Sequence, residues 1–244
     1  QMTAEFKDRL NQELNQFSIK IEDSQIIKFY EYYEILVEWN KVMNLTAITE
    51  QNEVITKHFV DSLALIKSVE EISLNSYRII DIGTGAGFPG IPLKIAFPQL
   101  KVTLMDSLNK RVKFLNEVIE KLDLKEIQAV HSRAEDLGRD KDYREQYDLS
   151  VSRAVANLST LSEYCMPFVK PGGFFISYKS GKIDEELTSA KHAIFLLSGK
   201  VSGVESFTLD GADAERTLVK IEKVNEISKK YPRKAGVPAK EPLK

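Results

Sequence analysis

The sequence is poor in the residues that build covalent and metal-based cross-links. Its 244 residues include one cysteine, Cys165, and three histidines. A single cysteine excludes an internal disulfide and a cysteine-based zinc cluster, and it is typical of proteins from reducing compartments. No stretch approaches the ~18 consecutive apolar residues that a membrane-spanning helix needs, and residues 1–17 lack the apolar segment of a secretory signal. We therefore expect a cytoplasmic protein with no membrane partner.

Charge of either sign is nearly balanced overall, but positive charge is concentrated at the C-terminus. The formal net charge is −2, whereas residues 228–244 hold six basic residues and one acidic residue. This asymmetry is typical of proteins that bind phosphate-rich partners. A disordered, solvated extension has the same composition, so charge alone leaves both interpretations open.

Hydrophobic spacing divides the chain into three parts. In residues 1–72 apolar side chains recur every three or four positions, which predicts helices at 3–17, from Asp23 or Ser24 onward, and at 53–69. In residues 73–227 short apolar runs alternate with amphipathic stretches, which is typical of a doubly wound α/β fold with a parallel sheet. The last two runs, 201–209 and 217–224, predict a closing antiparallel hairpin. We therefore expect an N-terminal helical cap packed on the core, an α/β domain and a basic tail at 228–244.

The strongest chemical signal is the loop that follows the first expected strand, Asp81-Ile-Gly83-Thr-Gly85-Ala-Gly-Phe88. Glycines at this place let the backbone turn sharply and approach a nucleotide. Dinucleotide loops read G-x-G-x-x-G, whereas this loop reads G-x-G-x-G. Asp81 disfavours a pyrophosphate and suits a cation, so the loop favours S-adenosylmethionine over a nicotinamide dinucleotide. A loop that only makes a tight turn is the remaining alternative.

Polar residues also follow the next three expected strands. Asp106 stands about 20 residues after the loop, where an acidic side chain binds ribose hydroxyls in such folds. Taken alone it is more typical of a helix N-cap, but beside the glycine loop ribose binding is favoured. Residues 132–136, which include Glu135, could clasp an adenine edge or form a solvated turn. Arg153 ends the fourth strand, at the edge that faces a bound methyl donor. It is our candidate active-site residue, and a salt bridge at the helix cap is the alternative.

Taken together these residues closely resemble one family, the bacterial small-subunit rRNA guanine-N7 methyltransferases, also called glucose-inhibited division protein B. The resemblance runs almost from end to end, and its motifs are 39–46, 57–63, 81–92, 106–111, 132–135, 152–154 and 231–236. Residues 237–240 depart slightly from the family's usual ending. The resemblance implies a Rossmann-like class I methyltransferase fold and methylation of N7 of a guanine in the decoding-centre hairpin of 16S rRNA. By position it also implies cofactor contacts at Gly83, Phe88, Ala134, Glu135 and Arg153.

The expected site therefore has a cofactor part and an RNA part. The cofactor residues are Asp81, Gly83, Gly85, Phe88, Asp106, Ala134, Glu135 and Arg153, and Arg153 is also the catalytic candidate. The RNA-binding candidates are Lys57, Arg133, Lys229, Lys230, Arg233 and Lys234, and we expect no metal. The expected partner is 16S rRNA or the 30S subunit, bound by a monomer. A methyltransferase acting on another RNA, or an RNA-binding assembly factor that retains a cofactor pocket, remains the alternative.

Guanine N7 carries no proton, so its methylation needs no general base. A missing catalytic dyad is therefore no argument against an enzyme. Cytosine C5 transfer needs a cysteine nucleophile, but Cys165 lies in an expected helix and is interpreted as a core residue. His131 ends a strand and is interpreted as structural.

Overall fold

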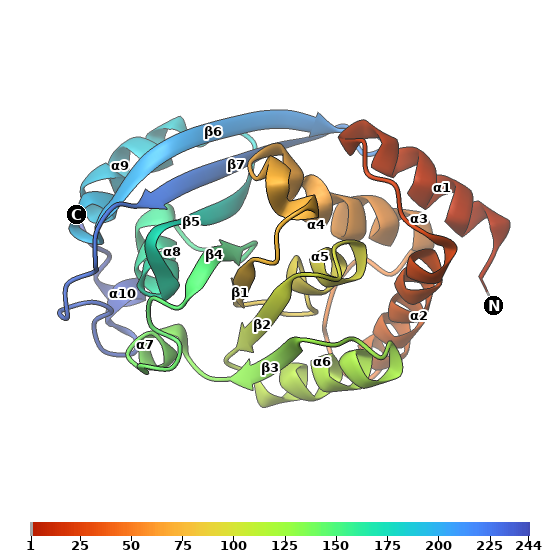
Figure 1. Cartoon of the computed structure of the whole chain (residues 1–244), viewed down its shortest axis with the longest axis horizontal. Helices are drawn as coiled ribbons and strands as arrows, with labels where there is room; N and C mark the ends of the chain where they lie inside the picture. Colours follow the sequence, from red (N-terminus) through yellow and green to blue (C-terminus); the bar gives the residue numbers. More distant parts are fainter. Residues whose placement is uncertain (1) are drawn as a thin grey trace.

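A computed structural model describes residues 2–244 of the chain, and its centre is a seven-stranded sheet (Figure 1). The strand order is β3-β2-β1-β4-β5-β7-β6. All pairs among β1 to β5 are parallel, whereas β7 runs antiparallel to both β5 and β6. The predicted α/β fold with a closing hairpin is therefore confirmed. The strands are β1 (Arg78–Ile82), β2 (Lys101–Asp106), β3 (Ile127–His131), β4 (Tyr147–Ser152), β5 (Val169–Ser180), β6 (Gly199–Leu209) and β7 (Ala214–Lys223).

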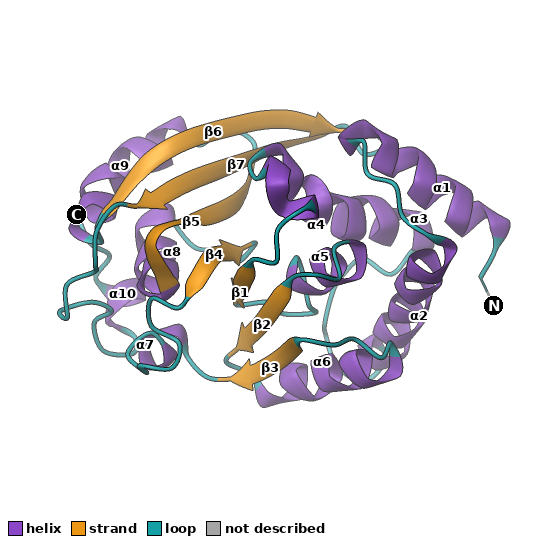
Figure 2. Cartoon of the chain, in the orientation of Figure 1, coloured by secondary structure: helices purple, strands orange, loops and turns teal. Residues whose placement is uncertain are grey.

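Helices cover both faces of the sheet (Figure 2). Ile79 and Leu104 point into a core shared with the N-terminal helices, α5 (Gly90–Ala96) and α6 (Asn109–Lys121). Ile80 and Met105, one position along each strand, point into a second core with α7 (Ala134–Leu137), α8 (Leu158–Cys165) and α9 (Asp184–Leu196). Side chains alternate between faces along a strand, so strands buried on both sides read as continuous apolar runs.

The N-terminal helices pack on the first of these faces. They are α1 (Ala4–Leu14), α2 (Asp23–Asn40), α3 (Gln51–Val54) and α4 (Asp61–Leu63). The helix expected at 53–69 is present but irregular, because a π-helical stretch at Ile55–Val60 joins α3 to α4 and a 3-10 turn follows. Phe29 of α2 and Phe59 of the π-helical stretch are fully buried, with ring centroids 5.0 Å apart. Within residues 2–244 no helix is long and apolar enough to cross a bilayer.

The C-terminal segment, residues 228–244, is folded onto the domain. Tyr231 and Pro238 are buried, and a short helix, α10 (Val237–Lys240), lies beside α8. The alternative of a disordered, solvated tail is therefore wrong. The N-terminal helices and this segment lie at opposite ends of the long axis of the molecule (Figure 1).

Candidate functional site

The glycine loop after β1 is held in shape by the side chain of Asp81. Its Oδ2 accepts hydrogen bonds from Thr84 Oγ1 at 2.7 Å and from the Gly90 amide at 2.8 Å. Gly83 and Gly85 adopt φ values of +67° and +59°, which disfavour residues with a Cβ. The carboxylate therefore ties the beginning of the loop to the beginning of α5.

Asp81 also has an unusual electrostatic environment. It is fully buried, and burial raises the pKa of its carboxyl to about 7 against the opposing effect of the Thr84 and Gly90 hydrogen bonds. Among residues 2–244 its second oxygen, Oδ1, has no hydrogen-bond partner. Buried polar atoms are nearly always paired, so this oxygen is a free acceptor at the base of the loop.

Asp106 at the end of β2 holds the other side of the loop. Its Oδ2 accepts from the Gly85 amide at 2.8 Å, and its Oδ1 accepts from the Leu108 amide at 3.0 Å. The N-cap of α6 is Leu108 and has no side-chain cap, so Asp106 is not the helix cap of the alternative; it holds the loop and the residues that lead into α6. His131 bonds the Ser107 carbonyl through Nε2 at 3.0 Å, which agrees with its interpretation as structural.

A cavity of about 510 Å³ opens at the carboxyl edge of β1, β2 and β4; we call it the edge cavity. Among the predicted residues, Gly83, Arg133, Ala134 and Glu135 line it. Asp81, Gly85, Phe88, Asp106 and Arg153 are placed around the loop rather than among the lining residues. The lining residues that sequence reasoning missed include Gly236 and Ala239 of the C-terminal segment.

The edge cavity fits a cationic nucleoside such as S-adenosylmethionine. The glycine at 83 leaves the cavity open on the loop side, where its Cβ would lie 3.4 Å from that of Ala154. Asp81 and Asp106 are buried beneath the glycine loop, and their carboxylates hold its backbone by accepting from the Gly90 and Gly85 amides. These features agree with the preference for a methyl donor over a pyrophosphate.

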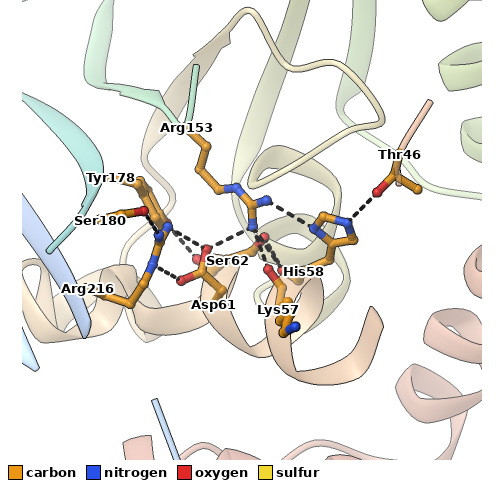
Figure 3. Close-up of polar contacts among 9 residues, drawn as sticks. All are labelled: Thr46, Lys57, His58, Asp61, Ser62, Arg153, Tyr178, Ser180 and Arg216. Carbon is orange, nitrogen blue, oxygen red and sulfur yellow. Dashed lines mark hydrogen bonds and ion pairs between the residues drawn. The ribbon is translucent and has the colours of Figure 1, made fainter. Parts of the chain in front are cut away.

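Arg153 reaches from the end of β4 to the N-terminal helices (Figure 3). Its guanidinium donates to Asp61 Oδ2 at 2.9 Å and lies 3.0 Å from His58 Nδ1. It also lies over the Phe88 ring, 5.3 Å from the centroid, and the His58 ring stacks on Phe88 at 4.3 Å. The structure therefore brings Arg153 and Phe88 together and adds two partners from the motif at 57–63, His58 and Asp61.

Asp61 is shared by a second arginine. Arg216 of β7 donates to Asp61 Oδ1 at 2.7 Å through Nε and to Oδ2 at 3.0 Å through Nη2. We call Asp61, Arg153, Arg216 and His58 the Asp61 cluster. Burial and the Arg153 charge lower the pKa of His58 to about 3, so this ring is neutral at neutral pH. The cluster therefore carries two positive charges and one negative charge beside the loop.

Sequence reasoning missed Asp61 and Arg216. Asp61 belongs to the 57–63 motif that carried part of the resemblance, but the sequence does not show which residues pair with it. Arg216 carries no local signal, because only the sheet order places the start of β7 beside the end of β5.

The RNA-binding candidates separate into two groups. Lys57, Arg133, Lys229, Lys230 and Lys234 are exposed. Arg233 instead points inward, and its guanidinium donates to both carboxylate oxygens of Glu163, at 2.7 and 3.0 Å. An arginine held in this way has little freedom to meet a phosphate, so the structure gives Arg233 an internal role in place of the expected RNA contact.

Cys165 lies fully buried in α8, and burial raises the pKa of its thiol. A thiol in this environment stays protonated and is not a nucleophile. Its interpretation as a core residue is confirmed.

Comparison with known proteins gives one consistent family. The family described as rRNA small subunit methyltransferase G matches residues 25–219. A protein named ribosomal RNA small subunit methyltransferase G from Lachnoclostridium phytofermentans is 54% identical over 95% of each chain. One of the same name from Acetivibrio thermocellus is 53% identical over 93% of this chain and 92% of its own.

Solved structures agree on the fold. TYW2 from M. jannaschii, in complex with AdoMet, superposes with a TM-score of 0.52 at 17% identity over 67% of this chain and 77% of its own. The YcgJ protein of Bacillus subtilis gives 0.52 at 12% identity over 69% of this chain and all of its own. At these identities the likeness concerns the fold of the sheet and its helices.

Proposed function

Because the chain belongs to the rRNA small subunit methyltransferase G family, we propose that it methylates N7 of a guanine in the decoding-centre hairpin of 16S rRNA, using S-adenosylmethionine. The observation that carries the proposal is the edge cavity, which joins the glycine loop to the Ala134–Glu135 turn at the carboxyl ends of β1, β2 and β4. Ligands of doubly wound sheets bind at this edge. The proposed partner is 16S rRNA or the 30S subunit, bound by a monomer.

The cofactor supplies an electrophilic methyl group on sulfur. Guanine N7 is a bare acceptor, so no residue has to remove a proton from it. The protein's task is to hold donor and acceptor in line, and such positioning contributes about 7–11 kcal/mol to rate enhancement. The site agrees with this demand, because its histidine, His58, has a pKa of about 3 and is therefore a weak base.

Arg153 is the proposed catalytic residue. It follows β4, beside Ala154 and Val155, which line the edge cavity. We propose that its guanidinium holds an anionic group of the cofactor or RNA next to the transferred methyl. Lys57 and Arg133 are proposed to contact RNA phosphates, together with Lys229, Lys230 and Lys234 of the C-terminal segment.

The test is methyl transfer from radiolabelled S-adenosylmethionine to 30S subunits and to protein-free rRNA from cells that lack this gene. We expect label in 16S rRNA and 7-methylguanosine after digestion to nucleosides. Subunits from cells that carry the gene are the control, since their target is already methylated. Label in another RNA or nucleoside would support the alternative methyltransferase. Cofactor binding with no label in any RNA would support the assembly factor.

A further inference from the structure

The C-terminal segment meets the proposed cofactor site directly. Gly236 and Ala239 line the edge cavity together with Gly83 and Glu135. The Gly236 amide donates to Glu135 Oε2 at 2.8 Å, and Thr160 Oγ1 of α8 donates to the Pro238 carbonyl at 3.1 Å. Part of the cavity lining is therefore built by the C-terminal segment.

One buried ion pair fastens this wall. Glu163 of α8 is fully buried, and both of its oxygens accept from the Arg233 guanidinium. Glu163 Oε2 also accepts from the Arg233 amide at 2.8 Å. Charge-assisted bonds of this bidentate kind fix geometry as well as contributing energy.

Two more arginines hold the chain that leads to the wall. Arg144 donates to the carbonyls of Tyr231 and Ser228 at 2.8 and 3.1 Å, and Arg139 donates to the Pro232 carbonyl. Both side chains bond backbone carbonyls of the segment. A loosely docked, mainly RNA-binding extension would not need such support.

We propose that residues 231–239 are a wall of the cofactor site, and that the pair between Arg233 and Glu163 holds it against the nucleoside. The inference rests on the proposed function and deepens it. Glu135 belongs to the turn after β3, where the adenine end is expected, and its Oε2 is occupied by the Gly236 amide. The wall therefore orients Glu135 and excludes water from one side of the nucleoside.

This inference reverses an expectation drawn from charge. A tail that only docks RNA contributes nothing to binding of free cofactor. A wall contributes to it in the absence of RNA. The dissociation constant for S-adenosylmethionine, measured by titration calorimetry on the full chain without RNA, separates the two.

The first variant, Arg233→Lys, keeps the charge and removes the fork that grips Glu163. We expect cofactor binding to weaken by about tenfold, the equivalent of about one lost hydrogen bond. Lys240→Ala is the matched control, because it removes a charge from an exposed position of the same segment. We expect Lys240→Ala to bind cofactor like the wild type.

A second variant does not depend on the ion pair. Ala239 is exposed and lines the edge cavity, so Ala239→Phe adds a ring to the wall and leaves the core intact. We expect weaker cofactor binding with an unchanged melting temperature. Wild-type affinity in both Arg233→Lys and Ala239→Phe would overturn the wall.

Failure of the proposed function would give different results from failure of the wall. A wild-type protein that binds S-adenosylmethionine but labels no rRNA would overturn the proposed substrate, while the variants still decide the wall. A wild-type protein that binds no S-adenosylmethionine would overturn both.

Discussion

Two buried carboxylates join the two ends of the chain to the α/β domain. In the N-terminal contact the carboxylate lies in the helical cap, and in the C-terminal contact it lies in the domain. Asp61 is part of the N-terminal cap and receives arginines from β7 and from the end of β4. Glu163 is part of the domain and receives one arginine from the C-terminal segment. α4 packs on one face of the sheet and α8 on the other. The N-terminal contact thus holds a residue of the proposed site, whereas the C-terminal contact holds a wall of the edge cavity.

The number of partners makes the two contacts unequal. Asp61 keeps one arginine when the other is removed, whereas Glu163 has no second ion-pair partner among residues 2–244. Removing one member of a buried pair is costly chiefly because the other charge stays buried alone. Redundancy therefore makes the N-terminal contact robust, because Asp61 stays paired when either arginine is lost.

The largest effect is expected at Glu163. Arg233→Ala leaves its carboxylate buried and unpaired, and we expect the free energy of unfolding to fall by about 3–5 kcal/mol. Urea unfolding followed by circular dichroism measures it. The control is Arg233→Met with Glu163→Gln, which removes both charges and should recover most of the loss. A loss below about 1 kcal/mol in Arg233→Ala would show that the pair does not hold the segment.

Asp61→Asn is expected to have the next largest effect. Both arginines lose their charged partner, but they are 18% and 17% exposed and regain some hydration. We expect unfolding free energy to fall by about 1–3 kcal/mol, with lower methyl transfer because Arg153 loses its orientation. Urea unfolding and initial rates at saturating cofactor measure the two. Unchanged stability would contradict the role of Asp61 as a fastener.

Lowering the pH tests the comparison further, because the Asp61 cluster contains a histidine and the pair between Arg233 and Glu163 does not. His58 has a pKa of about 3 when folded, below its value near 6.5 when unfolded, so the unfolded chain binds more protons between these values and stability falls as pH falls. Asp81 has the opposite effect on stability. Its folded pKa of about 7 exceeds the ordinary 3.8, so the folded chain binds more protons between these values and stability rises as pH falls. Each contributes about 2 kcal/mol between pH 6.5 and 5, and the two cancel in the wild type.

Single variants expose each contribution. We expect His58→Asn to gain stability from pH 6.5 to 5, and Asp81→Asn to lose it. Urea unfolding at both pH values, with the double variant as control, measures the slopes. Parallel slopes in the two single variants would contradict the opposite signs of the two pKa shifts.

The sequence predicted the parts of this site that follow from local pattern. β2, β3 and β4 are three of the short apolar runs expected between the amphipathic stretches, and the inner strands β2 and β4 are buried along most of their length. The sharp turn at Gly83 also follows from the local sequence, because glycine tolerates the positive φ that the loop needs. Local pattern thus placed the glycine loop, Asp106 and the turn at Glu135 at one edge.

What the sequence could not predict depends on partners distant in the chain. The residues that pair with Asp61 stand 92 and 155 positions away, and Arg233 stands 70 positions from Glu163. A basic residue carries the same local signal whether it faces solvent or a buried carboxylate. Charge patterning therefore assigned Arg233 to RNA, and only the fold distinguishes it from Lys229, Lys230 and Lys234.

Arg153→Ala should have the smallest effect on stability, and it tests whether Arg153 has a role in methyl transfer beyond its ion pair with Asp61. Asp61 keeps both bonds from Arg216, so we expect unfolding free energy to fall by only about 1 kcal/mol. Methyl transfer at saturating RNA and cofactor should fall by about 100-fold, as when a preorganised donor is removed from an active site. Arg216→Ala is the matched control, since it removes the other arginine from the same carboxylate; it should cost similar stability and far less turnover. Equal turnover losses in the two variants would mean that Arg153 acts only as a fastener, and that the N-terminal contact differs from the C-terminal one in redundancy alone.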